Sequence, residues 1–257
     1  MSNDVLDTSS WSQERRRTRH TPKPASTLQK AGTGVCLAIT AVALVLSWKV
    51  LSAGLASSHV TMSLAQWDRL GQAPQAQQWQ ATLESAVRAN DSYPVANGAY
   101  LDQLGQVQSW SAFDVPAADP AARDSRLAAL QAYRASVAVR PTWPDTWARL
   151  ATTKFALGEL DGEYQNAVEQ ANQWGAWRPD VQLELASIGL RAWPSMSVAQ
   201  RAAAVESMRK VMAGPRADAL HLLQLARLAG LQHVVCHGVA EDNARAQQLC
   251  TSTGGKF

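Results

Sequence analysis

The fold is decided by one stretch of the chain, which begins Tyr133-Arg-Ala-Ser136-Val-Ala-Val-Arg140-Pro141 and continues Trp143-Pro144-Asp145-Thr-Trp147-Ala-Arg-Leu150-Ala151. It then reads Leu157-Gly158-Glu-Leu160-Asp161-Gly162-Glu-Tyr164-Gln-Asn-Ala167-Val168, followed by Trp174-Gly175-Ala-Trp177-Arg178-Pro179 and an apolar segment ending near Trp193. Twice, an aromatic residue stands three positions before a small one, and an Arg-Pro pair and a new apolar segment follow. This order is typical of repeated helix pairs.

Helix boundaries can be placed within this stretch. Pro144 and Pro179 suit first helical positions, where no N–H is needed, and Gly158 suits a helix end. The carboxylates interpreted as helix caps are Asp145, Asp161 and Asp180. The residues expected to face inward are Trp147, Leu150, Ala151 and Phe155 in one helix, and Tyr164, Ala167, Val168 and Ala171 in the next.

The same apolar period extends to both sides. Hydrophobic residues make up 46% of the 257, and Val and Ile are too scattered to indicate strands. Further helices are expected over 75–89, 94–109, 120–139, 179–193, 198–213, 216–231 and about 241–250, with a loop over 111–119. Helix pairs of this kind are each too thin to bury their apolar faces alone. We therefore predict an all-α fold, with an α-solenoid of antiparallel helix pairs over residues 58–257.

A different composition marks the N-terminal part. Residues 1–30 are polar and basic and are expected to form a disordered cytoplasmic arm. Residues 31–48 carry no charge and the chain stays apolar to about residue 56, so 31–57 is expected to cross a membrane as a single helix. A cleaved signal peptide, processed near Gly54-Leu55-Ala56, is the alternative. By the positive-inside rule, an uncleaved anchor places the rest of the chain in the periplasm at a bacterial inner membrane.

The net charge of +3 gives no support to nucleic-acid binding. Six Lys and Arg residues against three Asp and Glu stand before residue 31, and the two signs are nearly balanced in the rest of the chain. The basic character therefore belongs to the arm, and no basic groove is expected in the main domain.

The sequence resembles two known groups of proteins. Tyr133-x-x-Ser136-x-x-x-x-Pro141, Trp147-x-x-Leu150-Ala151 and Tyr164-x-x-Ala167 resemble the helix ends and starts of tetratricopeptide repeats. The aromatic spacing is 31, against a usual period of about 34, and the insertion at 175–177 also departs from that pattern. The fuller stretch over 130–195, with the single membrane helix, resembles VpsP-like proteins of bacterial exopolysaccharide loci.

The VpsP-like resemblance implies an accessory role in polysaccharide synthesis, polymerisation or export. It supplies no catalytic residue. Its implied partners are exopolysaccharide synthesis or export proteins and nascent polysaccharide.

Aromatic residues are the main candidates for a binding surface. They are expected to pack between helices. The alternative is that some of them line a saccharide-binding groove, because aromatic faces stack on sugar rings. These residues are Trp143, Trp147, Tyr164, Trp174 and Trp177. The same two alternatives apply to Trp193.

Cysteines and histidines give one expectation and one weak alternative. Cys236 and Cys250 are 14 positions apart in a segment placed outside the cytoplasm, so a disulfide is predicted between them. Cys36 lies in the membrane segment. His233 and His237 share a helical face and, with Cys236, could mimic a zinc site, but no carboxylate stands at a recognisable spacing. No metal, cofactor or catalytic residue is predicted.

The function expected is therefore a membrane-anchored, non-catalytic scaffold for exopolysaccharide biosynthesis. A periplasmic polysaccharide hydrolase or lyase on a helical scaffold is the enzyme alternative, and it requires carboxylates clustered in a groove. A general interaction module of envelope assembly is the third possibility, because a repeat fold does not by itself specify a function.

Overall fold

The computed structural model describes residues 27–239 and 243–252, and within those ranges every regular element is a helix. The all-α prediction is confirmed. The basic arm expected over 1–30 lies outside the described residues up to residue 26, and from Thr27 onward the chain is helical.

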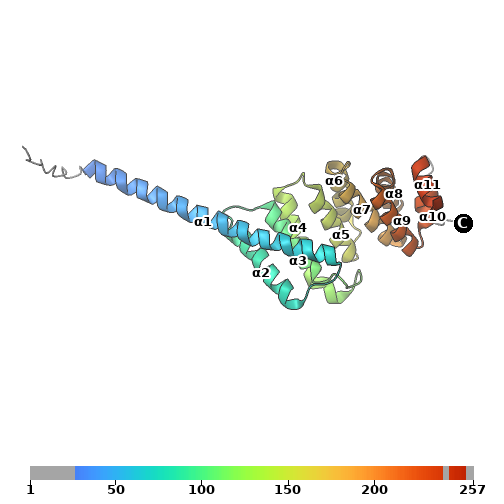
Figure 1. Ribbon diagram of the computed structural model, residues 1–257, viewed down its shortest axis with the longest axis horizontal. Helices are drawn as coiled ribbons and strands as arrows, with labels where there is room; N and C mark the ends of the chain where they lie inside the picture. The colour runs from blue at the N-terminus through green and yellow to red at the C-terminus, as the bar shows by residue number, and fades with distance from the viewer. Residues whose placement is uncertain (1–26, 240–242, 253–257) are drawn as a thin grey trace, which may run out of the picture. The chain divides into compact units, whose positions relative to one another are not determined.

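Figure 1 shows the helices in chain order. They are α1 Thr27–Leu70, α2 Ala76–Ser92, α3 Gly98–Trp110, α4 Arg123–Val139, α5 Pro144–Ala156, α6 Gly162–Trp174, α7 Pro179–Ala192, α8 Val198–Ala213, α9 Arg216–Leu228, α10 Gln232–Gly238 and α11 Ala244–Ser252. Short 3-10 turns occur at Pro120–Ala122 and Trp193–Ser195.

Helix α1 is long and apolar enough to span a membrane. Its most apolar 18-residue window has a mean hydropathy of 2.1, and none of that window is buried against protein. A core helix of a soluble protein would instead cover this surface. The chain divides into two compact units between Val45 and Leu46, so the packed unit includes residues 46–57, which the sequence analysis assigned to the anchor.

Within the second unit, α1 contributes a stripe of side chains to a small core. Val60, Leu64 and Trp67 recur at helical spacing and pack with Ala86 of α2 and Val107 of α3. The rest of the unit shares a larger core that runs from α4 to α11.

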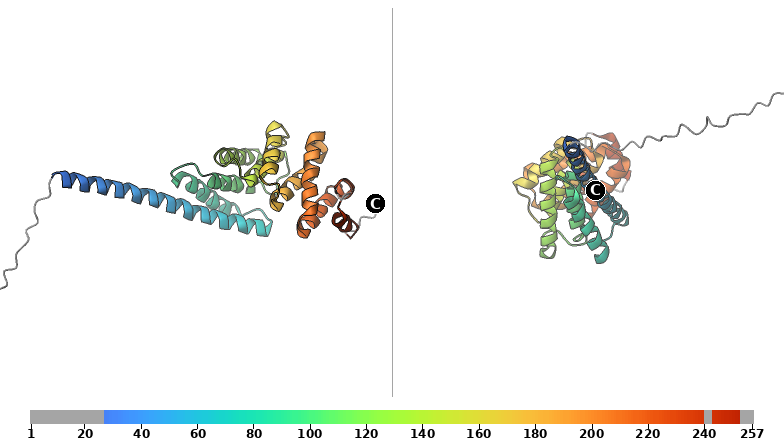
Figure 2. Two further views of the ribbon diagram at one scale, coloured as in Figure 1. Left: turned by 90° about the horizontal axis from the view of Figure 1, so that it is seen from above. Right: turned by 90° about the vertical axis from the view of Figure 1, so that its left-hand side faces the viewer.

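The second unit is built from consecutive helix pairs, α3 with α4, α5 with α6, and α7 with α8. The first helices of successive pairs also contact one another, α5 with α7 and α7 with α9. Figure 2 shows these pairs from two further sides. This stacking is the solenoid packing predicted from the sequence, because each pair buries its apolar face only against its neighbours.

The boundaries of the deciding stretch are largely as predicted. Pro144 and Pro179 are the first residues of α5 and α7. Asp161 caps α6, since its Oδ1 accepts hydrogen bonds from the backbone N–H groups of Glu163 and Tyr164 at 3.1 Å each. Gly158 ends the α5 segment with a φ of +79°, a conformation that glycine adopts without strain.

The interpretation of Asp145 and Asp180 as helix caps is wrong. The cap positions of α5 and α7 are occupied by Trp143 and Arg178. Both carboxylates instead form ion pairs with Arg178, at 2.9 Å for Asp145 and 2.5 Å for Asp180. This bridge joins the first turns of α5 and α7, so the two acids fix neighbouring helices relative to each other.

Three further expectations are wrong. Helix α3 begins at Gly98 after an Asn97 cap, not at Pro94. Val87 and Leu228, which follow the apolar period of the helices expected over 75–89 and 216–231, are 42% and 79% exposed instead of buried. Helix α9 ends at Leu228, and Gly230 follows with a positive φ.

A buried lysine ties α5 to α6. Lys154 is 2% exposed, and its Nζ lies 2.5 Å from Glu159 Oε2, 2.7 Å from Asp161 Oδ2 and 3.4 Å from Glu163 Oε2. Arg134 of α4 forms a bidentate pair with Glu163. The hydrogen bond from Lys154 holds the pKa of Asp161 below its usual value, and the one from Arg134 does the same for Glu163.

Helices α3 and α4 approach closely at a glycine. A Cβ built on Gly105 would lie 2.5 Å from Cε1 of the Tyr133 ring, and Tyr133 is 2% exposed. A buried ring cannot swing aside as a flexible chain end can. Any side chain at position 105 therefore forces the two helices apart or displaces the tyrosine.

We expect Gly105→Ala to lower the free energy of unfolding by about 1–3 kcal/mol, because the added methyl group overpacks the α3–α4 contact. Urea unfolding of the full chain in detergent, followed by circular dichroism, measures this. Gly162→Ala is the matched control, since a Cβ there meets nothing within 4 Å. Equal stability of the two variants would contradict the close contact.

The structure contains the predicted disulfide between Cys236 and Cys250. It joins α10 to α11, the last two short helices, and both cysteines are buried with Val235 and Leu249 in the end of the larger core. A helix of nine residues is marginal by itself. The covalent link therefore keeps α11 on the core.

We expect the double substitution of Cys236 and Cys250 by Ala to lower the free energy of unfolding by about 3 kcal/mol, the loop-closure value for a link of this length. Thermal unfolding in detergent, with and without reductant, measures the loss. Cys36→Ser is the control, since Cys36 is an exposed free cysteine. Reductant that leaves the unfolding of the natural chain unchanged would count against a stabilising role.

Candidate binding groove

A groove of about 420 Å³ lies on the row formed by the first helices of successive pairs. Helices α3, α5 and α7 supply most of its wall, with contributions from the end of α1, from α4 and from the loop after α3. The residues that line it are Asp68, Gln106, Ser109, Trp110, Phe113, Tyr133, Arg149, Thr152, Thr153 and Glu184.

The floor of the groove is organised by Asp102 of α3, which is 7% exposed. Its Oδ2 accepts hydrogen bonds from Arg149 Nη1 and Gln106 Nε2, both at 2.8 Å, and its Oδ1 accepts one from Thr146 Oγ1 at 2.9 Å. Three donors satisfy the buried carboxylate. The network locks α3 to α5 and neutralises the arginine charge beneath the groove.

Tyr133 of α4 lies under the groove and presents its hydroxyl to it. Tyr133 OH and Ser109 Oγ are 3.3 Å apart. Burial, with the nearby Asp102 carboxylate, raises the pKa of Tyr133 far above its usual value. The phenol therefore remains a neutral hydrogen-bonding group at physiological pH.

Two carboxyl groups, Glu184 of α7 and Asp68 of α1, face the groove from different helices. Thr152 Oγ1 donates a hydrogen bond to Glu184 Oε1 at 2.7 Å. Burial raises the pKa of Glu184 above its usual value. Burial also raises the pKa of Asp68, and the charge of Arg149 partly opposes that rise. Both acids pay a desolvation cost for their place in the groove.

An aromatic wall closes one side of the groove. The rings of Trp110 and Phe113 stack at 4.4 Å between centroids, and Trp67 meets Trp110 edge-on at 5.8 Å. Trp67 is 3% exposed, whereas Phe113 is 46% exposed. The wall is therefore anchored in the small core and open to solvent at Phe113.

A buried arginine positions the loop that carries Phe113. Arg126 donates hydrogen bonds to the backbone oxygens of Val115 at 2.7 Å, Pro116 at 2.9 Å and Ala156 at 3.0 Å. Its contact with the last turn of α5 also places the cation at the negative end of that helix. The loop is thus fixed to the α5 end of the groove, and burial lowers the pKa of Arg126 from its usual value.

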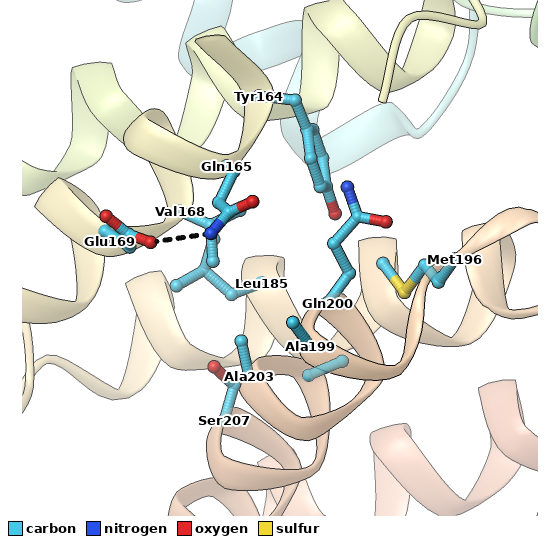
Figure 3. Close-up of a pocket in the computed structure, with 11 residues that line it drawn as sticks. Tyr164, Gln165, Val168, Glu169, Leu185, Met196, Ala199, Gln200, Ala203 and Ser207 are labelled. Atoms are coloured by element: carbon cyan, nitrogen blue, oxygen red, sulfur yellow. Dashed lines mark hydrogen bonds between the residues drawn. The ribbon is translucent and has the colours of Figure 1, made fainter. Parts of the chain in front are cut away.

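A second, smaller cavity of about 230 Å³ lies between α6 and α8. Figure 3 shows Tyr164 and Gln165 entering it from α6, opposite Gln200 and Ser207 from α8. Burial raises the pKa of Tyr164 to about 12. Gln200 Oε1 accepts a hydrogen bond from the backbone N–H of Ser197, and its Nε2 donates one to Leu160 O. Ser207 Oγ is buried with no hydrogen-bond partner among the described residues.

The structure separates the aromatic residues that the sequence analysis grouped. Trp143 is 40% exposed beneath the Arg140 guanidinium, which lies 3.8 Å from its ring centre. Trp147 Nε1 donates to Pro141 O at 2.7 Å, and Trp174 Nε1 donates to Gln170 Oε1 at 3.1 Å.

Trp177 is 76% exposed, so it has no packing role. Of the five aromatic candidates, Tyr164 alone lines either of the two cavities described above, the smaller one. The structure therefore does not assemble them into a single stacking platform at either cavity.

The histidines and cysteines do not form a metal centre in the part of the chain that the structure describes. No group of three or more His, Cys, Asp or Glu side chains there is placed to hold an ion. His233 is exposed, and Cys236 is engaged in the disulfide.

Sequence reasoning missed the groove because its residues come from five separate segments of the chain. One local signal was available on α5, where Thr146 and Thr153 are polar positions seven apart that are both buried, with Arg149 between them. Threonine is a poor helix former, so its repeated use inside a helix points to a polar role.

No family model, no curated protein and no solved structure matches the chain.

We expect Glu184→Gln to raise the free energy of unfolding at neutral pH, because the amide removes a desolvated charge and can still accept the Thr152 hydrogen bond. The raised pKa means that the folded state holds the proton more tightly than the unfolded state does. The natural chain therefore loses stability as pH rises from the ordinary glutamate value through the raised one. The advantage of the variant should vanish below a pH of about 4.3.

Urea unfolding at a series of pH values measures this effect. Glu169→Gln is the control, since Glu169 is an exposed residue of α6 outside the groove, and its stability should change by less than about 0.5 kcal/mol at every pH. A Glu184→Gln variant that is less stable at neutral pH would show that the carboxylate contributes favourably to the folded state.

Proposed function

We propose that this protein is a membrane-anchored, non-catalytic scaffold whose helix-pair domain binds a partner protein in the groove on α3, α5 and α7. The observation that carries the proposal is the combination of a rigid polar floor, anchored on Asp102, with an exposed aromatic rim at Phe113. Recognition sites commonly join a few placed polar groups to an aromatic anchor. Stacked helix pairs offer such surfaces without further adaptation.

The process we assign is exopolysaccharide synthesis, polymerisation or export at a bacterial inner membrane. The sequence resemblance over 130–195 supports this assignment. The uncovered apolar window of α1 supports anchoring by one helix, and the disulfide supports an extracytoplasmic position for the domain, since disulfides persist in oxidising compartments. The N-terminal arm then lies in the cytoplasm. Nascent polysaccharide remains a second class of ligand for the same scaffold.

The non-catalytic assignment rests on how the groove hydroxyls are used. Ser109 Oγ donates to the backbone oxygen of Gly105 at 3.0 Å, and Thr152 Oγ1 lies within hydrogen-bonding distance of both Ala148 O and Glu184. Among the residues that the structure describes, neither hydroxyl is paired with a histidine base of the kind that activates a nucleophile.

A photo-crosslinking amino acid in place of Phe113 should capture proteins of the polysaccharide machinery in cells that carry the gene. Phe113 is at the rim of the groove, so a bound partner lies within reach. The same amino acid at Val198, which is 85% exposed at the start of α8, should not capture them. Deletion of the gene should abolish secreted polymer. Capture of cell-division or secretion proteins instead would favour the general envelope module.

A polysaccharide hydrolase or lyase is the second candidate. One observation favours it, since Asp68 and Glu184 line the same groove and burial raises the pKa of both. A raised pKa is what a general acid requires, and two carboxyl groups are what glycoside hydrolysis requires. New reducing or unsaturated ends released from the exported polymer by the purified chain, and not by Glu184→Gln, would replace the scaffold proposal.

A further inference from the structure

The groove carries an excess of negative charge. Its charged lining residues are Asp68, Arg149 and Glu184, and the arginine is already paired with Asp102 at 2.8 Å. Arg178 is paired with both Asp145 and Asp180 and so supplies no free cation. Within the part of the chain that the structure describes, neither Asp68 nor Glu184 forms an ion pair with a Lys or Arg side chain, and the unfavourable desolvation of each carboxylate is the cost that a bound cation would offset.

The shape of the groove suits a long side chain with a charged end. The aromatic wall of Trp110 and Phe113 offers an apolar surface that can cover an aliphatic stem, and ring faces also attract cations. The two carboxyl groups lie on α1 and α7, so a cation between them would be contacted from both helices. A volume of about 420 Å³ admits one such side chain with part of its backbone.

We propose that the groove binds a lysine or arginine side chain of the partner polypeptide, with Glu184 and Asp68 contacting the cation and Trp110 and Phe113 covering its stem. This inference rests on the proposed function and names the chemistry of its partner. Glu184 is the principal recognition residue. Thr152 holds one carboxylate oxygen at 2.7 Å and so fixes the direction in which the carboxylate points.

A polypeptide fits this groove better than an amine-bearing glycan does. A hexosamine has hydroxyl groups around its ring and no apolar stem to lie against the aromatic wall. One face of Trp110 is already stacked on Phe113, which leaves less free indole surface for a sugar ring. The alternation of an apolar wall and an acidic end matches the long, amphipathic side chains of lysine and arginine.

Blocked amino acids test the proposal on the full chain in detergent. The cationic probes are N-acetyl-arginine amide and N-acetyl-lysine amide, and their neutral counterparts are N-acetyl-citrulline amide and N-acetyl-norleucine amide. Ligand-observed NMR titration should show binding of both cationic probes and at least about tenfold weaker binding of the neutral ones. Glu184→Gln should weaken the cationic probes by about tenfold or more, since it removes the fixed charge.

Glu169→Gln, outside this groove, should leave the affinity for the cationic probes unchanged, and Asp68→Asn should reduce it. Equal binding of arginine and citrulline, absence of binding by either cationic probe, or unchanged binding by Glu184→Gln would overturn the proposal. So would tighter binding of glucosamine than of the arginine probe.

The two proposals fail separately. Partner capture at position 113 without cation binding would leave the scaffold function standing and remove the assigned chemistry. Cation binding without partner capture would do the reverse, since the groove would then have its ligand class but no role in assembling the machinery.

Discussion

The carboxylate of Asp102 is the interaction on which the groove depends. It is buried in α3 and accepts hydrogen bonds from Thr146 and Arg149 of α5, so it joins the first helices of two successive pairs. Loss of this group would leave the arginine charge without its partner in a partly buried position, which is far more costly than removal of both. The same contact that stacks one helix pair on the next thus prepares the surface that we assign to binding.

The residues packed around Asp102 determine which side chains the groove presents to a ligand. Tyr133 fits beneath the groove because Gly105 has no side chain to displace its ring. Arg126 fixes the loop that brings Phe113 to the rim. With these elements rigid, the remaining polar groups, Glu184 and Asp68, are positioned before any ligand arrives. Preorganisation of this kind reduces the entropy that binding must offset. The aromatic residues of the 143–177 segment do not line this groove. They lie at helix ends, pack partly against neighbouring helices or stand in exposed loops.

Much of the architecture was predictable because local chemistry specified it. Pro144 and Pro179 begin helices, Asp161 caps one, Gly158 ends one, and the inward face of Tyr164 and its neighbours follows a helical period. Two errors arose because a polar residue had two possible uses. Asp145 and Asp180 stand in first turns and resemble caps, but Arg178 lies close enough to both to pair with them. Sequence spacing gives no measure of that competition.

The sequence by itself determined the helical class, the apolar N-terminal helix, the pairing of Cys236 with Cys250 and the succession of helix pairs. Each of these depends on hydrophobic period, composition or short sequence spacing. Only the tertiary structure decided where the groove lies. Its lining comes from α1, α3, α4, α5 and α7, over residues 68 to 184, and these positions share no local pattern. Charge balance, burial and the direction of each side chain arise when helix pairs stack, which is why a binding surface remained hidden in a sequence whose repeats were readable.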